Sequence, residues 1–358
     1  MENRVYNTYM KGIEIMYPNI SYKEIKEKLN EGEYIIIDVR TPNEYKTGTI
    51  PGSINLPIFS NEERAEIGIE YVNKSTDQAK VLGIEAISKR LPALFNEVLK
   101  LKSKYPHLIF FCSRGGFRSS SIVALLDSLK ISAIKLEGGY KEYRSYVNSQ
   151  LEKEAKDLSL IVLYGNTGTG KTQILKALEK KGADIIDLEG CANHRGSTLG
   201  SVGLGSPNSQ KMFESLLFDS ISKRKTNTIF IEGESKRIGK SVIPDYLFDK
   251  IKNGRHIEVT APIEKRIENI KKDYLFNTDN DLIEALNHLR KRLGNKTIDD
   301  FIESVNKGSY EPVIKSLMLT YYDPMYEHNK KNYVFTLENI NPEKSAEILL
   351  SKFLKKRE

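Results

Sequence analysis

The sequence has 358 residues, of which 39% are hydrophobic and 29% are charged, so it predicts two globular domains and excludes both a single small module and a disordered chain. Fifty-five Lys and Arg against 48 Asp and Glu give a net charge of +7, which permits a polyanionic partner without requiring one. Two cysteines exclude a disulfide framework. The first residues lack a signal-peptide core and no apolar run approaches the roughly 20 residues of a membrane helix, so we expect a cytoplasmic protein that does not contact membranes.

Short apolar runs, mostly without alternation, recur along the chain and are separated by segments with helical character. This pattern is typical of parallel strands that are buried on both faces, and it predicts an α/β fold. The expected strands are 34–38, 108–111, 133–136, 160–164, 184–188, 228–232 and 256–260.

The order of these strands predicts a domain organisation. Residues 140–156 contain no Gly or Pro and should link two α/β domains. After Thr260 we expect no further strand, and the rest should be helical, with Thr260 as N-cap and Pro262 in the first turn. The predicted parts are a first domain at 1–147, a second α/β domain at 148–260, and a helical C-terminal region at 261–358.

The first domain contains a long connection at about 58–104 between its first two strands. An amphipathic helix is expected there at 85–102. Long insertions at such places are often functional, and a surface helix without a role explains the segment equally well.

Cys112 directly follows the strand at 108–111 and is followed by a predicted helix. Backbone N–H groups of the loop, the helix dipole and two arginines would favour a thiolate and any anion brought to it. Cys112 is therefore a candidate nucleophile, in a loop that contains Arg114, Gly115, Gly116 and Arg118.

The spacing from Cys112 to Arg118 also fits the signature of cysteine phosphatases, which need a thiolate and an Arg fork for phosphate. Phe111 stands where that signature usually has His. The loop alone does not exclude phosphatase chemistry.

A phosphate-binding loop follows the strand at 160–164 and precedes a helical segment, as the motif G-x-x-x-x-G-K-[ST] demands. Its glycines let the backbone wrap a phosphate, its lysine neutralises phosphate oxygens, and its last hydroxyl could hold Mg²⁺. The residues are Gly165, Asn166, Thr167, Gly168, Thr169, Gly170, Lys171 and Thr172.

What this loop holds is left open by the sequence. Glu232 and Glu234 end the strand at 228–232, where a metal-organising acid would lie, but the strand does not close on Asp. Any diphosphate would satisfy the loop, and the only metal expected is Mg²⁺ at Thr172.

A Gly-rich stretch at 190–205 carries His194 and Arg195 just beyond a strand end, where open α/β sheets bind ligands. A surface loop without ligand is an equally good interpretation. Cys191, in the same stretch, is interpreted as a passive thiol.

Several separated motifs in the first domain, in the right order, resemble the rhodanese family, in which a loop cysteine carries sulfur or selenium. The resemblance covers about residues 13–147, with Thr49 and Tyr143 in places where the family often has His and Trp. The motifs are Asp38-Val-Arg40, Glu44-Tyr45, 48–57, the Cys112 loop and 137–143.

The whole chain resembles the tRNA 2-selenouridine synthase family. Further motifs that carry this resemblance are 67–71, 79–83, 192–197, 231–235 and 321–326. The departure is Ser113, where that family commonly has Trp, and it concerns substrate packing rather than the chemistry of Cys112.

This resemblance implies a two-step reaction on wobble 2-thiouridine of tRNA. Geranyl diphosphate first S-geranylates the thiouridine, and selenium from selenophosphate then replaces the geranylthio group. Cys112 would handle selenium with Arg114 and Arg118 as its anion fork, and the phosphate loop would bind a prenyl diphosphate, whose departure Lys171 assists. No tightly bound cofactor is implied.

The partners expected on this basis are tRNA, the two small phosphorylated substrates and a selenophosphate-producing enzyme. Scattered basic groups could line a tRNA path, although solvated helix faces would explain each of them. They are 223–225, 271–272 and 290–292.

Two other classes of function remain compatible with the sequence. One is a rhodanese-type sulfurtransferase fused to an ATPase or small-molecule kinase, without RNA. The other is a nucleotide-gated regulatory binder in which the rhodanese fold only docks a partner.

Overall fold

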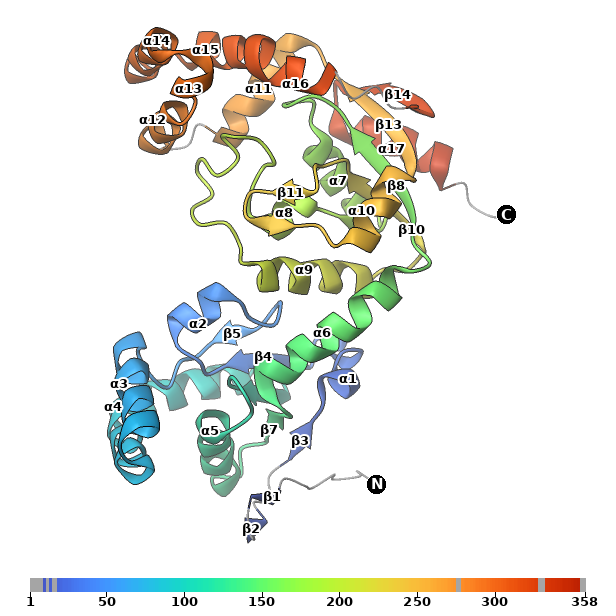
Figure 1. Ribbon diagram of the computed structural model, residues 1–358. Helices are drawn as coiled ribbons and strands as arrows, with labels where there is room; N and C mark the ends of the chain where they lie inside the picture. Colours follow the sequence, from blue (N-terminus) through green and yellow to red (C-terminus); the bar gives the residue numbers. More distant parts are fainter. Residues whose placement is uncertain (1–8, 11–12, 15–17, 275–277, 328–331, 355–358) are drawn as a thin grey trace. The chain divides into compact units, whose positions relative to one another are not determined.

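The computed structural model describes residues 9–10, 13–14, 18–274, 278–327 and 332–354. The chain divides into two compact units, Met1–Gln150 and Leu151–Glu358 (Figure 1). The predicted division at 147/148 falls next to this boundary, and residues 261–358 belong to the second unit.

Unit 1 contains a five-stranded, wholly parallel sheet in the order β3-β7-β6-β4-β5. The predicted strands at 34–38, 108–111 and 133–136 are its three longest strands. The bounds are β3 Asn19–Ile20, β4 Tyr34–Asp38, β5 Ile54–Asn55, β6 His107–Phe111 and β7 Ala133–Leu136, and a separate antiparallel pair is formed by β1 Tyr9–Met10 and β2 Ile13–Glu14.

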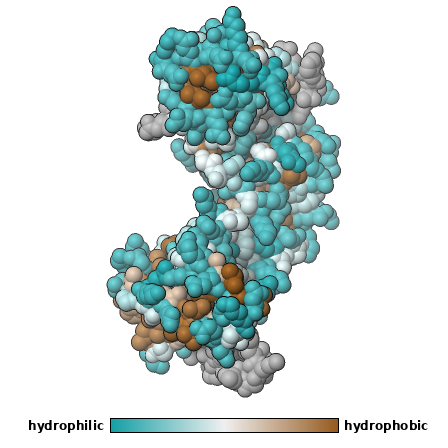
Figure 2. Space-filling model, turned by 60° about the vertical axis from the view of Figure 1, so that its left-hand side comes forward, coloured by the Kyte–Doolittle hydropathy of each residue, from teal (hydrophilic) through white to brown (hydrophobic). Residues whose placement is uncertain are grey.

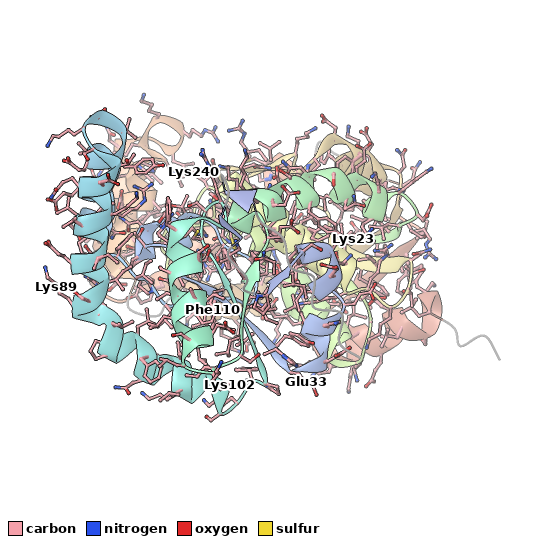
Figure 3. The ribbon with its side chains drawn as sticks, turned by 90° about the horizontal axis from the view of Figure 1, so that it is seen from below. Lys23, Glu33, Lys89, Lys102, Phe110 and Lys240 are labelled. Carbon is pink, nitrogen blue, oxygen red and sulfur yellow. The ribbon has the colours of Figure 1, made fainter. Side chains whose placement is uncertain are left out.

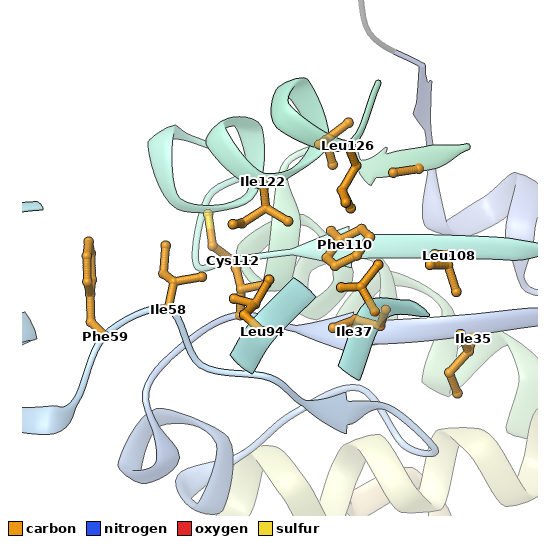
Figure 4. Packing of buried hydrophobic residues seen from close by; sticks show 14 of the residues in the cluster. Ile35, Ile37, Ile58, Phe59, Leu94, Leu108, Phe110, Cys112, Ile122 and Leu126 are labelled. Carbon is orange, nitrogen blue, oxygen red and sulfur yellow. The ribbon is translucent and has the colours of Figure 1, made fainter. Parts of the chain in front are cut away.

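The core of unit 1 follows from alternation along β4 and β6. Ile35, Ile37 and Val39 share one face of the sheet with Leu108 and Phe110, and helices α4 and α5 pack on that face through apolar side chains (Figure 4). The helices of this unit are α1 Tyr22–Ile25, the 3₁₀ helix η1 Lys28–Glu31, α2 Pro42–Thr47, α3 Asn61–Asn73, α4 Thr76–Lys102 and α5 Phe117–Ser128.

The insertion forms two helices where the sequence predicted one. Helix α4 begins at Thr76, well before the expected start at residue 85, and α3 precedes it. The Ser60 hydroxyl and the Glu63 carboxylate form a reciprocal cap that begins α3, a pattern the prediction missed. In Figure 3, Lys89 points outward from α4, whereas Phe110 lies inside the unit.

Figure 2 shows a mostly hydrophilic surface on which hydrophobic residues gather in separate patches. The insertion contributes exposed apolar side chains, among them Ile69 and Val72 of α3 and Val81 and Ile84 of α4. None of the described helices is both long and apolar enough to cross a lipid bilayer.

Helix α6, Gly139–Ala155, occupies the segment expected to link the two α/β domains. The boundary between unit 1 and unit 2 falls after Gln150, inside this helix. The link is therefore regular helix, as its lack of internal Gly and Pro predicts.

Unit 2 contains a second parallel sheet, in the order β14-β13-β8-β10-β9, and a short antiparallel pair, β11 with β12. The predicted strand at 184–188 is reduced to two residues. The strands are β8 Ser159–Tyr164, β9 Ile185–Ile186, β10 Thr228–Glu232, β11 Arg237–Ile238, β12 Ser241–Val242, β13 Arg255–Thr260 and β14 Phe335–Glu338.

The helices of unit 2 fall into two groups. Those that accompany the sheet are α7 Lys171–Lys180, α8 Leu188–Ala192, α9 Gln210–Ser222, α10 Asp245–Lys252 and α17 Pro342–Phe353. Those of the helical region are α11 Ile263–Tyr274, α12 Asp279–Asn287, α13 Arg290–Leu293, α14 Asn295–Asn306, α15 Tyr310–Leu317, the π-helix η2 Met318–Tyr322 and α16 Asp323–Glu327.

The prediction that no strand follows Thr260 is wrong. Strand β14 pairs in parallel with β13 at the edge of the sheet, and of its four residues only Leu337 is buried. An edge strand with one buried residue lacks the apolar run that reveals a central strand. The prediction that Thr260 caps a helix is also wrong, because Thr260 ends β13 and α11 begins at Ile263.

Candidate functional site

Cys112 continues the row of side chains formed by Leu108 and Phe110, so its side chain lies at the end of the core face of β6 (Figure 4). The residue is only 4% exposed. The hydroxyl of Ser119, in the first turn of α5, donates to Sγ at 3.3 Å, and Sγ lies 3.8 Å from the carbonyl oxygen of Gly116. The sulfur is thus held where β6 passes into α5.

Two glycines at the start of α6 shape the cysteine loop. A Cβ on Gly139 would lie 2.3 Å from the carbonyl oxygen of Cys112, and both Gly138 and Gly139 have positive φ, at 62° and 58°. The N–H groups of Tyr140 and Lys141 then donate to the carbonyls of Cys112 and Ser113, each at 2.9 Å. The double glycine is therefore needed for the backbone of α6 to approach the loop.

Arg118 forms a forked ion pair with Glu44. Its guanidinium donates to the two carboxylate oxygens at 2.5 and 3.0 Å and to the Ser113 hydroxyl at 2.7 Å, and that hydroxyl donates to Glu44 at 3.0 Å. Burial alone would raise the pKa of Glu44, but Arg118 outweighs it and the pKa falls to about 2. The charge of Arg118 is therefore largely compensated by Glu44.

Glu44 is held from a third side, because its carboxylate also accepts the N–H of Thr41 at 3.1 Å in a cap of α2. In the sequence, Glu44 stood out only as part of a motif. Its position two residues after Pro42, where a capping glutamate is common, was the signal that α2 begins there.

The other three candidates of this loop differ in their surroundings. The Arg114 side chain is exposed, whereas Gly115, with φ of 62°, faces backbone atoms of Gly138 and Leu136. Gly116 is the residue before α5. Arg114 is therefore the arginine of the loop that faces solvent.

Asp38 and Arg40 form a buried ion pair with distances of 2.6 to 3.1 Å. Arg40 also donates to the carbonyl of Gly48 at 2.7 Å, and its guanidinium lies 4.1 Å from the ring centre of Tyr140. Thr49 donates to Asp38 at 2.8 Å. These two candidates thus support the start of α6, which in turn shapes the cysteine loop.

In unit 2, the phosphate loop connects β8 to α7 as predicted. A Cβ on Gly165 would lie 2.3 Å from the carbonyl of Val259, and Gly168 and Gly170 have φ of 82° and 87°. Lys171 Nζ donates to the carbonyl of Gly165 at 3.0 Å. Each of these glycines is thus required by backbone conformation or by close approach.

Side chains from the helical region and from the residue after β14 bind the carbonyl oxygens of this loop. Arg266 donates to Thr167 at 2.9 Å, Asn269 to Gly168 at 2.9 Å, and Asn339 to Thr169 at 2.8 Å, while the Thr169 hydroxyl donates to Asn166 at 2.9 Å. The carbonyl and the following N–H of a trans peptide point in opposite directions. Anchoring the carbonyls of Thr167 and Thr169 therefore turns the N–H groups of Gly168 and Gly170 to the other side of the loop, whereas the N–H of Thr169 donates to the carbonyl of Asn166 at 3.3 Å.

These anchoring residues were not found from the sequence. Arg266 is itself held by a bidentate ion pair with Asp323, at 2.6 and 2.9 Å, and Asn339 accepts the Ser345 hydroxyl at 2.8 Å. Asp323 lies within the motif at 321–326, which carries part of the family resemblance but from which the sequence predicted no contact. No local pattern distinguishes Asn339 from a surface Asn.

Carboxylates gather beside Thr172. Its hydroxyl lies 3.2 Å from Glu189 and 3.3 Å from Glu232, and Glu232 also accepts the N–H of Leu188 at 2.8 Å. Burial raises the pKa of Glu189 to about 7, with the neighbouring Glu234 adding to the effect, and burial likewise raises the pKa of Glu232 and of Glu234. Glu189 was not found from the sequence, because it lies in α8 after a strand of only two residues.

The described residues contain no group of three or more His, Cys, Asp and Glu side chains arranged to hold a metal ion. Mg²⁺ at Thr172 stays a prediction.

The Gly-rich stretch is folded against this site. Gly196 packs on Glu234, since a Cβ there would lie 2.5 Å from its carboxylate. Arg195 donates to the carbonyl of Val202 at 2.7 Å, and the ring of His194 lies between Gly200 and Gly239, where burial lowers its pKa. His194 and Arg195 thus shape the stretch.

An apolar pocket adjoins the phosphate loop. It holds about 510 Å³ of space, open solvent included, and it lies among the helices α11, α12 and α15 and the 190–205 stretch. Thr167 of the phosphate loop is part of its wall. The other lining residues are Ser197, Leu199, Ile270, Leu282, Tyr310, Val313, Ile314, Leu317, Met318 and Tyr322.

The remaining candidates are more weakly connected to either site. Burial raises the pKa of the Cys191 thiol, as expected for a passive cysteine. Several of the basic side chains suggested for a tRNA path are paired with acids, among them Lys223 with Asp219 and Arg224 with Glu154.

The fold and the two loops define a protein in which a rhodanese-like domain with a cysteine loop is joined to a phosphate-loop α/β domain. A family model described as the tRNA 2-selenouridine synthase AAA domain matches residues 158–348, and one described as a rhodanese-like domain matches residues 21–146. The chain belongs to the tRNA 2-selenouridine synthase family, which confirms the resemblance seen in the sequence.

Curated relatives agree with this assignment. A tRNA 2-selenouridine synthase from Hydrogenovibrio crunogenus is 32% identical, covering 82% of this chain and 88% of its own length. One from Nitrosomonas eutropha is 33% identical, covering 73% of this chain and 68% of its own length. Among solved structures, the N-terminal domain of a putative ATP/GTP binding protein from Clostridium difficile 630 is 38% identical, covering 36% of this chain and 97% of its own, with a TM-score of 0.34.

Proposed function

We propose that this enzyme converts wobble 2-thiouridine of tRNA to 2-selenouridine through S-geranyl-2-thiouridine, using geranyl diphosphate and selenophosphate. The observation that carries the proposal is the apolar pocket that shares Thr167 with the phosphate loop. A diphosphate on the loop would leave its attached chain beside apolar side chains, which suit a prenyl group better than a ribose and base.

In the first step, the thiouridine sulfur forms a bond to C1 of the geranyl group as the C1–O bond to diphosphate breaks, and the uridine N3 loses its proton. Negative charge develops on the departing diphosphate. Lys171 and the N–H groups of the loop stabilise that charge.

Mg²⁺ fits the groups beside Thr172, because the carboxylates of Glu189 and Glu232 lie within 3.3 Å of the Thr172 hydroxyl and all three groups are oxygen ligands. When bound there, Mg²⁺ would neutralise diphosphate oxygens. The Thr172 hydroxyl and the two carboxylates would hold it.

In the second step, the P–Se bond of selenophosphate breaks as water takes up the phosphoryl group, and the selenide forms a bond to C2 of the geranylated nucleoside while the C2–S bond breaks. One proton of the selenide leaves with geranylthiol and the other goes to N3, so selenium keeps its oxidation state. Cys112 lies at the loop where this transfer takes place. S-alkylation prepares this exchange because it makes C2 electrophilic and gives it a good leaving group. Arg114 is the exposed cation of the loop and would attract selenophosphate, while Arg118 shapes the loop with Glu44. A selenophosphate-producing enzyme in the cytoplasm would supply this substrate.

The first experiment compares ligands by thermal unfolding. Geranyl diphosphate should protect the protein more than ATP at equal concentration, because a ligand that binds only the native state stabilises it with the logarithm of its saturation. Lys171→Ala should abolish the protection. Strong protection by ATP with release of phosphate, and none by geranyl diphosphate, would favour the fused ATPase or kinase instead.

A further inference from the structure

Phe117 is an exposed aromatic residue beside the cysteine loop. It is the first residue of α5 and is 59% exposed, whereas Ile122, Val123 and Leu126 of the same helix are buried in the core of unit 1. The core therefore does not account for an aromatic ring at this position.

The position of Phe117 ties it to the reactive sulfur. It directly follows Gly116, whose carbonyl oxygen lies 3.8 Å from Cys112 Sγ. Ser119, in the first turn of α5, also contacts Sγ, so the start of this helix lies beside the sulfur.

Exposed positive charges lie on the same loop and beside it. The Arg114 side chain is exposed on the loop, and so is that of Lys141, whose backbone N–H donates to Ser113 at 2.9 Å. Arg118 contributes less, because Glu44 compensates it.

We infer that Phe117 and Arg114 recognise the RNA at the cysteine loop, with the base of the modified nucleoside stacked on the Phe117 ring and a neighbouring phosphate paired with Arg114. Proteins recognise single-stranded RNA by this combination of aromatic stacking and cationic side chains. The inference rests on the proposed function in one respect, that Cys112 is where selenium meets the nucleoside. It goes further by naming the residues that hold the substrate there.

The experiment uses the full chain and an anticodon stem–loop RNA that carries S-geranyl-2-thiouridine. Binding is measured by fluorescence anisotropy, and selenation is measured by nucleoside mass spectrometry with saturating selenophosphate. Phe117→Ala should raise Kd and KM by about fivefold or more, as loss of one stacked base predicts. Phe117→Tyr should stay within about twofold of the wild type.

Two matched controls separate stacking from general damage. Leu129, at the other end of α5, is 51% exposed, and Leu129→Ala should leave both constants unchanged. Iodoacetamide should alkylate Cys112 at the same rate in the Phe117 and Leu129 variants as in the wild type, which shows that the loop is intact.

Arg114→Ala should also weaken binding, but with a different signature. Loss of one phosphate contact lowers the slope of log K against log salt by about 1, whereas Phe117→Ala should leave the slope unchanged.

Three results would overturn the inference. They are unchanged Kd and KM in Phe117→Ala, full activity and affinity in Phe117→Leu, which keeps apolar contact without an aromatic face, and an unchanged salt slope in Arg114→Ala. A wild-type enzyme that binds the stem–loop through Phe117 but never selenates it would instead contradict the proposed function.

Discussion

The two arginines of the cysteine loop look equivalent in the sequence and differ in the structure. Arg118 is paired with Glu44 and the Ser113 hydroxyl, while Arg114 faces solvent. A short motif shows which charges are near a nucleophile. It does not show which of them a distant acid has already compensated.

Replacing Cys112 tests the chemistry of this loop. Cys112→Ser should abolish formation of selenouridine, because a serine hydroxyl stays protonated and cannot replace a thiolate in handling selenium. Geranylation should survive, and mass spectrometry of tRNA nucleosides measures both products. Cys191→Ser is the matched control and should still selenate; selenouridine at the wild-type rate in Cys112→Ser would remove Cys112 from the mechanism.

The Glu44 and Arg118 pair should make unit 1 sensitive to acid. Since the pKa of Glu44 is lowered to about 2 from a usual 4.5, its contribution to stability is complete above pH 4.5 and is lost as the pH falls towards 2. Glu44→Gln should therefore lower the free energy of unfolding by about 2 kcal/mol at neutral pH, with a difference that shrinks in acid.

Hydrogen exchange of the amides in β4 and β6 follows this unit separately from unit 2. The comparison variant Glu63→Gln removes a more exposed ion pair with Arg90 and should cost less. A constant difference between wild type and Glu44→Gln from pH 7 to pH 2 would contradict this account.

At the scale of elements, the sequence was most informative where burial is complete. The runs at 34–38, 133–136 and 228–232 coincide with β4, β7 and β10, because a strand covered on both faces is apolar at nearly every position. Edge strand β14 and helix α3 were missed, since the first has one buried residue and the second has none.

The candidate sites show the same limit. Cys112 and the phosphate loop were visible because their motifs are contiguous. The residues that hold these loops were not visible, because they are distant in the sequence. Glu44 lies 74 positions from Arg118, and Asn339 lies 170 positions from Thr169. One sequence without its fold carries no signal for such pairs.

Strand β14 should matter for ligand binding although it is an edge element, because Asn339 directly follows it. Asn339→Ala leaves the Thr169 carbonyl and the Ser345 hydroxyl without their buried amide partner, which should cost about 1 to 3 kcal/mol of stability. It should also weaken geranyl diphosphate binding, measured by calorimetry.

Asn253→Ala is a suitable comparison, because the Asn253 amide makes an exposed hydrogen bond at the end of α10. That change should alter stability by less than about 0.5 kcal/mol. Equal affinity for geranyl diphosphate in Asn339→Ala and Asn253→Ala would show that the end of β14 does not shape the phosphate loop.

At the scale of the whole molecule, two chemically different sites lie in separate units of one chain. Cys112 belongs to the first unit and Lys171 to the second. Damage to either site should therefore stop the proposed pathway at a different intermediate.

Lys171→Ala tests this division. Without the lysine charge, diphosphate departure is unsupported, so the geranylated intermediate should not form. When supplied with tRNA that is already geranylated, the variant should make selenouridine at the wild-type rate. A folded variant that binds this tRNA and still fails to selenate it would show that the two sites are not independent.

The double glycine at the start of α6 has a consequence for the order in which the protein is made. Cys112 leaves the ribosome before β7 and before residues 138–141, of which Tyr140 and Lys141 donate their N–H groups to the carbonyls of Cys112 and Ser113. A nascent chain, or a fragment that ends ahead of Gly138, therefore contains the thiol without the backbone that shapes its loop. The Cys112 loop therefore cannot take up its folded shape until the first unit has been synthesised almost to its end.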